Sequence, residues 1–282
     1  MARISVSAVW DRTTEFIGDR TGAVLAVAAP AILAALVAQQ IAQRVLADAP
    51  VASAIAGLAL QIPLLWAQLQ VMALAIDPAV APAEALQRAT NRLPAALLLW
   101  LAMFMVAVAA MVPLGVLLAA SGVPFERIVA LGPEADPAAI AALIPKSAAP
   151  FLLTAILYLF AAGIALLILF LRWAVVYVVA LVEAVALPAL GRSWRLTRGM
   201  TLALIGVALL YGLVATVAAL AAQTVVGAVL GLIFGRGGEL GVASLGGGIA
   251  AAIVATAMAI VAAAFLAKFY LAQRRLEDGL RG

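Results

Sequence analysis

The chain has 282 residues, of which 67% are hydrophobic and only 11% are charged. Soluble domains are about 45–50% apolar and about 25% charged, so this composition predicts a protein that resides in a lipid bilayer. The chain contains no histidine and no cysteine. Disulfides, thiolate or imidazole metal sites, histidine-dependent catalysis and histidine proton relays are therefore excluded.

A short amphipathic helix is predicted before the first apolar run, within residues 1–20. Val6, Val9, Trp10, Phe16 and Ile17 can share one side of a helix, and the charged residues are mostly on the other side. A helix of this kind with a central tryptophan is typical of the membrane interface.

Uncharged runs long enough for spanning helices then follow one another along the chain. A span needs about 20 predominantly apolar residues at 1.5 Å per residue. The sequence predicts an all-α polytopic protein with six spans: Thr21–Gln43, Val51–Ile76, Leu93–Ser121, Ala148–Leu187, Met200–Gly235 and Gly246–Ala267. The fourth contains neither glycine nor proline from residue 164 to residue 186 and is predicted to be one long helix.

The positive charges predict how these spans are oriented. Six spans place both termini on one side, with twelve of the 17 Lys and Arg residues: Arg3, Arg12, Arg20, Arg88, Arg92, Arg192, Arg195, Arg198, Lys268, Arg274, Arg275 and Arg281. The other side has Arg44, Arg127, Lys146 and Arg236, and Arg172 lies within a span. The positive-inside rule then places both termini in the cytoplasm. Cleavage of a signal peptide near Ala47-Asp-Ala49 is the alternative for the first span.

The two halves of the chain, residues 21–121 and 148–273, are weakly similar. Asp77 to Arg88 and Glu183 to Arg192 each contain an acid at the end of a span, a proline and an Ala-Leu-x-Arg helix start. We therefore expect two parallel three-helix halves. Between them, residues 122–147 form an extracytoplasmic loop in which Asp136 caps a short helix that Pro145 ends. Residues 274–282 form a cytoplasmic tail.

One segment, Arg172 to Gly199, resembles a family of bacterial membrane proteins. Its pattern is an arginine, an apolar stretch, Glu183, an Ala-Leu-x-x-Ser-Trp helix and a Leu-Thr-x-Gly exit. The family is named for the membrane domain attached to some glycerophosphoryl diester phosphodiesterases, and it includes small inner-membrane proteins. The resemblance implies a bacterial inner-membrane protein. The hydrolase domain has no counterpart in this chain, so we expect no enzymatic activity and no cofactor.

Polar residues in and near the spans form the candidate functional cluster. It consists of Arg172, Glu183, Arg192, Ser193, Trp194, Thr197, Arg198, Gln61 and Gln68. Arg172 and Glu183 are eleven residues apart, about 16 Å along one helix, and so cannot pair within it. Either these charges line a polar path, or they form interhelical ion pairs, in which Glu183 can meet Arg192, Arg195 or Arg198. Ser193 and Thr197 can serve as caps and Trp194 as an interfacial anchor.

Small residues predict close helix packing near the end of the chain. Gly227, Gly231 and Gly235 repeat every four residues, which suits contacts within the bundle or between protomers. We expect membrane lipids as partners and no binding of nucleic acid. Two functions remain open. The first is a non-catalytic scaffold or lipid- or partner-binding protein; the alternative is a small transporter or lipid-handling permease with a polar site around Arg172 and Glu183.

Overall fold

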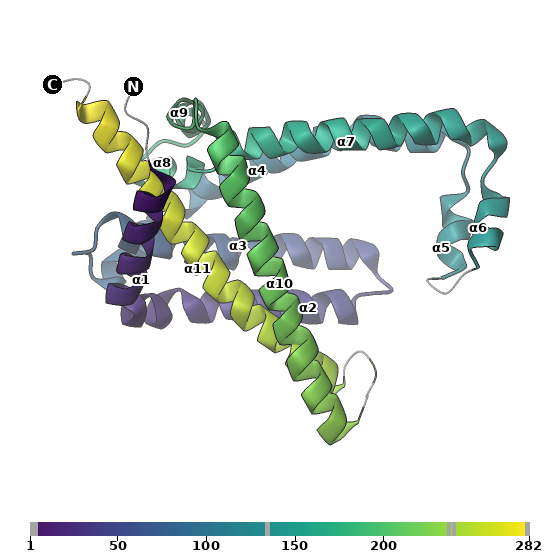
Figure 1. The fold of residues 1–282 in the computed structure, drawn as a ribbon, viewed down its shortest axis with the longest axis horizontal. Helices are drawn as coiled ribbons and strands as arrows, with labels where there is room; N and C mark the ends of the chain where they lie inside the picture. Colours follow the sequence, from purple (N-terminus) through teal and green to yellow (C-terminus); the bar gives the residue numbers. More distant parts are fainter. Residues whose placement is uncertain (1–4, 133–135, 236–237, 239–240, 280–282) are drawn as a thin grey trace. The chain divides into compact units, whose positions relative to one another are not determined.

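The computed structural model describes residues 5–132, 136–235, 238 and 241–279. Three basic residues used to predict the orientation lie outside the described part of the chain: Arg3, Arg236 and Arg281. The first and last residues of the predicted domains, 1 and 282, also lie outside it. The described part contains α-helices and one short 3-10 helix, and no strand is found in it (Figure 1). The helices are α1 (Val6–Val27), α2 (Ala29–Val45), α3 (Pro50–Ile76), α4 (Pro82–Ala120), α5 (Phe125–Ala130), α6 (Pro137–Leu143), α7 (Ala149–Arg172), α8 (Val176–Glu183), α9 (Pro188–Leu196), α10 (Thr201–Phe234) and α11 (Val242–Gly279).

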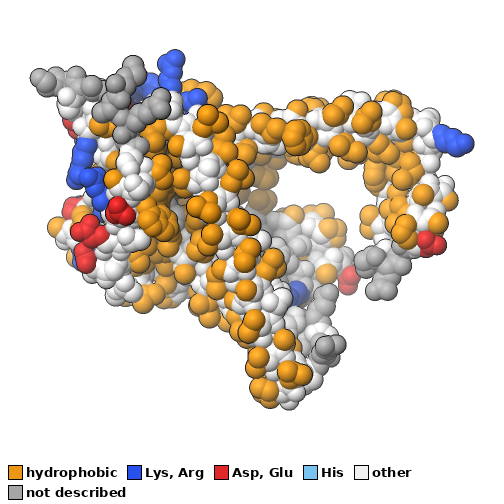
Figure 2. All heavy atoms as spheres, in the orientation of Figure 1, with side chains coloured by type: hydrophobic (Ala, Val, Ile, Leu, Met, Phe, Trp, Pro, Cys, Tyr) orange, Lys and Arg blue, Asp and Glu red, His pale blue; other side chains and the backbone are white. Residues whose placement is uncertain are grey.

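The predicted all-α polytopic class is confirmed. Five segments of the described chain are long and apolar enough to cross a membrane, α7 and α8 counting together as one. A sixth is obtained if α1 and α2, which are bent by 59° relative to each other, count as one span. Figure 2 shows hydrophobic side chains over the surface of the long helices. In α10, Leu204 alone of 34 residues is buried, so most of this helix is available to lipid.

The first predicted span is bent. α1 consists of two helical parts joined by a kink at Arg20, where φ is −120° and ψ is 17°, so the predicted end of the amphipathic helix near residue 20 agrees with this kink. The apolar run then bends at Ala28, and Pro30 lies in the first turn of α2. Proline has no amide hydrogen and its ring clashes with the preceding turn, which explains why the helix is not straight.

The fourth predicted span is also interrupted. α7 ends at Arg172, residues 173–175 form a turn, and α8 ends at Glu183 rather than at Leu187. The single long helix predicted for residues 148–187 is therefore wrong. By contrast α3, α10 and the helix that Asp136 caps, α6, lie where the sequence predicts them.

The chain divides into two compact units, residues 1–99 with 171–282, and residues 100–170. In the first unit α11 packs against α1, α2, α3 and α10, and α2 lies beside α3 (Figure 1). The apolar side of α1 faces α11, where the ring of Trp10 lies 6.4 Å from that of Phe265. In the second unit the Tyr158 hydroxyl donates to the carbonyl of Ala110 at 2.6 Å. The two predicted three-helix halves remain a prediction.

Glycine allows α10 and α11 to approach closely. A Cβ added at Gly247 would lie 2.7 Å from the backbone oxygen of Gln223, and one added at Gly227 would lie 3.4 Å from that of Ala243. Gly235 ends α10 with a φ of 81°, a conformation that favours glycine. Gly227 therefore packs within the chain, and oligomerisation through Gly227, Gly231 and Gly235 remains a prediction.

Candidate functional site

The turn between α7 and α8 removes a backbone hydrogen bond at Arg172. In a continuous helix the amide of Val176 would donate to the carbonyl of Arg172, but here it donates to Trp173 at 3.0 Å. The Arg172 carbonyl accepts instead from the Ser193 hydroxyl at 2.9 Å and lies 3.0 Å from the Thr197 hydroxyl, whose single proton can be donated to it or to the carbonyls of Ser193 at 2.9 Å and Trp194 at 3.3 Å. Both side chains are fully buried. Two hydroxyls near the end of α9 therefore cap the interrupted helix α7.

The side chain of Arg172 lies against Trp194. Its guanidinium carbon is 5.0 Å from the centre of the indole ring, within the range of a cation–π interaction. Its Nε and one terminal nitrogen are shielded from solvent and make no hydrogen bond to the described residues. Arg172, the charged residue predicted to lie within a span, thus packs on the ring of Trp194 in α9 and forms no ion pair with Glu183.

Glu183 belongs to a separate network at the end of α8. Its Oε1 accepts from Arg192 Nε at 3.2 Å and from the Tyr270 hydroxyl at 3.0 Å. Arg192 also makes a two-pronged ion pair with Glu277, in which NH1 lies 3.0 Å from Oε1 and NH2 contacts Oε2. Of the three arginines that the sequence offers to Glu183, it is Arg192 that forms the ion pair. It joins α8, α9 and α11.

Arg192 is held in its charged form by this network. The hydrogen bond to Glu277 raises the pKa of its guanidinium above the ordinary value, against a smaller lowering by burial, and the bond to Glu183 raises it further. The network borders a cavity of about 390 Å³ lined by three acidic and three basic residues: Glu183, Glu277, Asp278, Arg192, Arg195 and Arg274. Because these formal charges balance, the cavity has no net charge that would select an ion.

Three members of the predicted cluster lie outside these two arrangements. Gln61 and Gln68 are half-buried on α3, whereas the part of α3 that lies near α8 is around Ala73 and Ile76. Gln61 precedes Ile76 by fifteen residues, about 22 Å along the helix. Arg198 is exposed after the end of α9. The polar path that the transporter alternative requires is therefore not assembled from these residues.

Sequence reasoning missed two partners, Glu277 and Tyr270, and the candidate cluster left out one buried polar group, Gln70. The partners belong to α11, more than 80 residues after Glu183. Gln70 on α3 is fully buried, and its amide has no hydrogen-bond partner among the described residues. The only local signal for these partners is that Glu277 follows Arg274 and Arg275 at the end of an apolar helix. This position does not indicate with which arginine Glu277 forms an ion pair.

A second feature of this unit is a large apolar groove. It has a volume of about 680 Å³ and is formed by α1, the turn after α7, α10 and α11. Its walls are almost entirely hydrophobic and include Trp10, Ala208 and Phe265. Tyr211 lies in the wall, but its hydroxyl donates to the carbonyl of Met258 at 2.7 Å, so its polar atom is already bonded. The groove therefore suits an apolar occupant.

Within the described residues, no group of three acidic side chains is placed to hold a metal ion. No family model, curated protein or solved structure matches the chain. The family resemblance of residues 172–199 consequently remains a prediction from the sequence.

Proposed function

We propose that this chain is a non-catalytic integral protein of the bacterial inner membrane that binds lipid, with both termini in the cytoplasm. The observation that carries the proposal is the apolar groove between α1, α10 and α11. Its volume of about 680 Å³ falls within the range of roughly 300–1,000 Å³ that is usual for ligand sites. In a bilayer, a groove with almost no polar surface suits the acyl chain of a lipid.

The charged residues support a binding role rather than catalysis or transport. Arg172 is stacked on Trp194, and Glu183 is bonded to Arg192 and Tyr270. Groups held in this way fix the positions of α8, α9 and α11 relative to one another. These contacts hold the helices of the first unit in place around the groove. The orientation of the chain is supported by the distribution of Lys and Arg, twelve against four.

A bulky side chain in the groove tests this proposal. Ala208 lines the groove, and its replacement by Trp is expected to displace the bound acyl chain because the indole occupies the same apolar space. Detergent-purified Ala208→Trp should retain much less phospholipid than the wild type, measured as lipid per protein by native mass spectrometry. The control is Ala221→Trp, on the exposed surface of the same helix and outside the groove. Equal retention in Ala208→Trp and wild type, at unchanged thermal stability, contradicts the proposal.

A further inference from the structure

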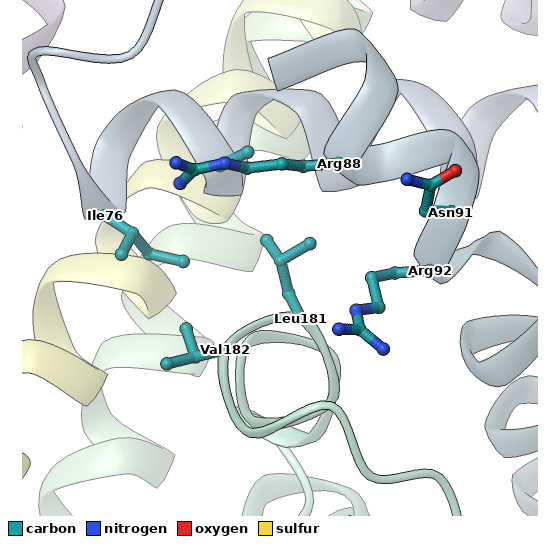
Figure 3. A pocket seen from close by; sticks show the side chains of 7 residues that line it. Ile76, Arg88, Asn91, Arg92, Leu181 and Val182 are labelled. Atoms are coloured by element: carbon teal, nitrogen blue, oxygen red, sulfur yellow. The ribbon is translucent and has the colours of Figure 1, made fainter. Parts of the chain in front are cut away.

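A second cavity in the same unit differs from the groove in its charge. It has a volume of about 340 Å³ and lies between α3, α4 and α8 (Figure 3). Its polar wall is formed by Arg88, Asn91 and Arg92, all on α4, and its apolar wall includes Ile76 and Leu181. Figure 3 shows the arginine side chains of α4 extending over the apolar side chains of α3 and α8.

The two arginines give this cavity an excess of positive charge. They are four residues apart on α4 and so lie on the same face, one turn from each other. Arg88 is neutralised by Glu84, whose Oε1 lies 2.7 Å from its NH2. Arg92 is half-buried, and no carboxylate of the described residues forms an ion pair with it. The cavity thus presents one guanidinium whose charge is not balanced by an acid.

The segment predicted to match in the second half allows a comparison. Arg192 corresponds to Arg88 in the weak internal repeat, and two glutamates contact it. α9 also has a second arginine, Arg195, about one turn beyond Arg192, and no carboxylate of the described residues forms an ion pair with it. Arg195 is exposed, whereas Arg92 is half-buried, so Arg92 is the one that is partly shielded from water.

The position of the cavity along the chain indicates where it lies relative to the bilayer. Ile76 is the last residue of α3, and Leu181 is two residues before the end of α8. From Leu93 to Ala120, directly after Arg92, α4 contains no charged residue. The arginines thus lie where the apolar part of the helices begins, which is the depth of lipid phosphates.

We propose that this cavity binds the phosphate of an anionic membrane phospholipid, with Arg92 as the main ligand and Arg88 and Asn91 beside it. Guanidinium groups bind phosphate oxygens through paired hydrogen bonds, and they are stronger in this role where water is partly excluded. The apolar side chains of α3 and α8 continue from the cavity toward the hydrocarbon region and suit the glycerol and first carbons of the lipid. A free phosphate ion has no apolar part that would contact these side chains. The site is separate from the apolar groove.

The test measures preference for phosphatidylglycerol over phosphatidylcholine with the same acyl chains. The full chain is purified in detergent, mixed with both lipids, and the bound lipids are counted by native mass spectrometry. Both lipids have a phosphate, but the choline of phosphatidylcholine offsets its charge, and one positive charge near a net anionic headgroup is worth about fivefold in affinity. Arg92→Gln should therefore lower the preference about fivefold, whereas Arg127→Gln, at an exposed arginine of α5 outside the cavity, should leave it unchanged.

A second variant keeps the test independent of the folding of Arg92→Gln. Asn91 is exposed, and Asn91→Asp places a carboxylate of nearly the same size beside Arg92, so it should lower the preference to a similar extent. An unchanged preference in both cavity variants, or an equal loss in Arg127→Gln, overturns the proposal. Full competition by millimolar inorganic phosphate identifies a site for soluble phosphate and overturns the lipid assignment. Because the readout is a ratio of headgroups, failure of the groove to hold acyl chains changes the total lipid bound and not this ratio.

Discussion

Replacing Arg192 with glutamine is expected to lower the free energy of unfolding by about 1–3 kcal/mol, below the value of about 3–5 kcal/mol for fully buried pairs. Arg192 lies between Glu183 and Glu277, and their side chains are only 20%, 30% and 31% exposed. The substitution leaves two carboxylates facing each other without a cation. The measurement is thermal or denaturant unfolding of the purified protein in one detergent.

The other members of the network provide the controls. Glu183→Gln should have a much smaller effect, because Arg192 keeps Glu277 and the new amide oxygen still accepts from Tyr270. Combining Arg192→Gln with Glu277→Gln should restore part of the lost stability, since one of the two carboxylates is removed. If Arg192→Gln and Glu183→Gln are equally destabilising, Arg192 is not the centre of the network.

Removing both hydroxyls that cap α7 should also destabilise the protein, by about 1–3 kcal/mol, which is the cost of an unsatisfied buried polar group. Ser193→Ala and Thr197→Val each leave one hydroxyl on the carbonyl of Arg172, so each alone should have a small effect. The double variant leaves that carbonyl without a donor. We therefore expect its loss of stability, measured in the same unfolding experiment, to exceed the sum of the two single losses.

The matched control for this cycle is Thr224→Val. Thr224 is exposed on α10 and its hydroxyl donates only to carbonyls of its own helix, so a change within about 0.5 kcal/mol is expected. Additive losses in the Ser193 and Thr197 variants would show that the two hydroxyls do not share one acceptor.

The sequence is sufficient to predict the helices but not their interruptions. Uncharged runs locate α3 and α10, and Asp136 followed by Pro137 locates α6, because these signals are local. The turn at residues 173–175 has no glycine or proline to mark it. It is stabilised by hydroxyls from α9, about twenty residues later, and such a contact depends on how the chain folds back.

The candidate site was likewise predictable only in part. Pairing of Glu183 with one of the arginines that follow it was expected from the cost of charges in a bilayer, and the structure selects Arg192 among the three. The hydroxyls of Ser193 and Thr197 were expected to cap a helix, and they do, although the helix is α7. Glu277 and Arg92 acquire their roles from packing, since nothing local distinguishes an arginine with an acid partner from one without.

The two proposals require that the chain crosses the membrane with both ends on one side, and this depends on the bent pair α1 and α2 forming one span. The chain contains no cysteine, so single cysteines can be introduced without background. The measurement is labelling of Ser5→Cys, Asp48→Cys and Gly279→Cys by a membrane-impermeant maleimide in sealed vesicles of each orientation. The account predicts that residues 5 and 279 react from the same face and residue 48 from the opposite face. Labelling of residues 5 and 48 from one face would mean that α1 and α2 do not cross the bilayer, and would contradict it.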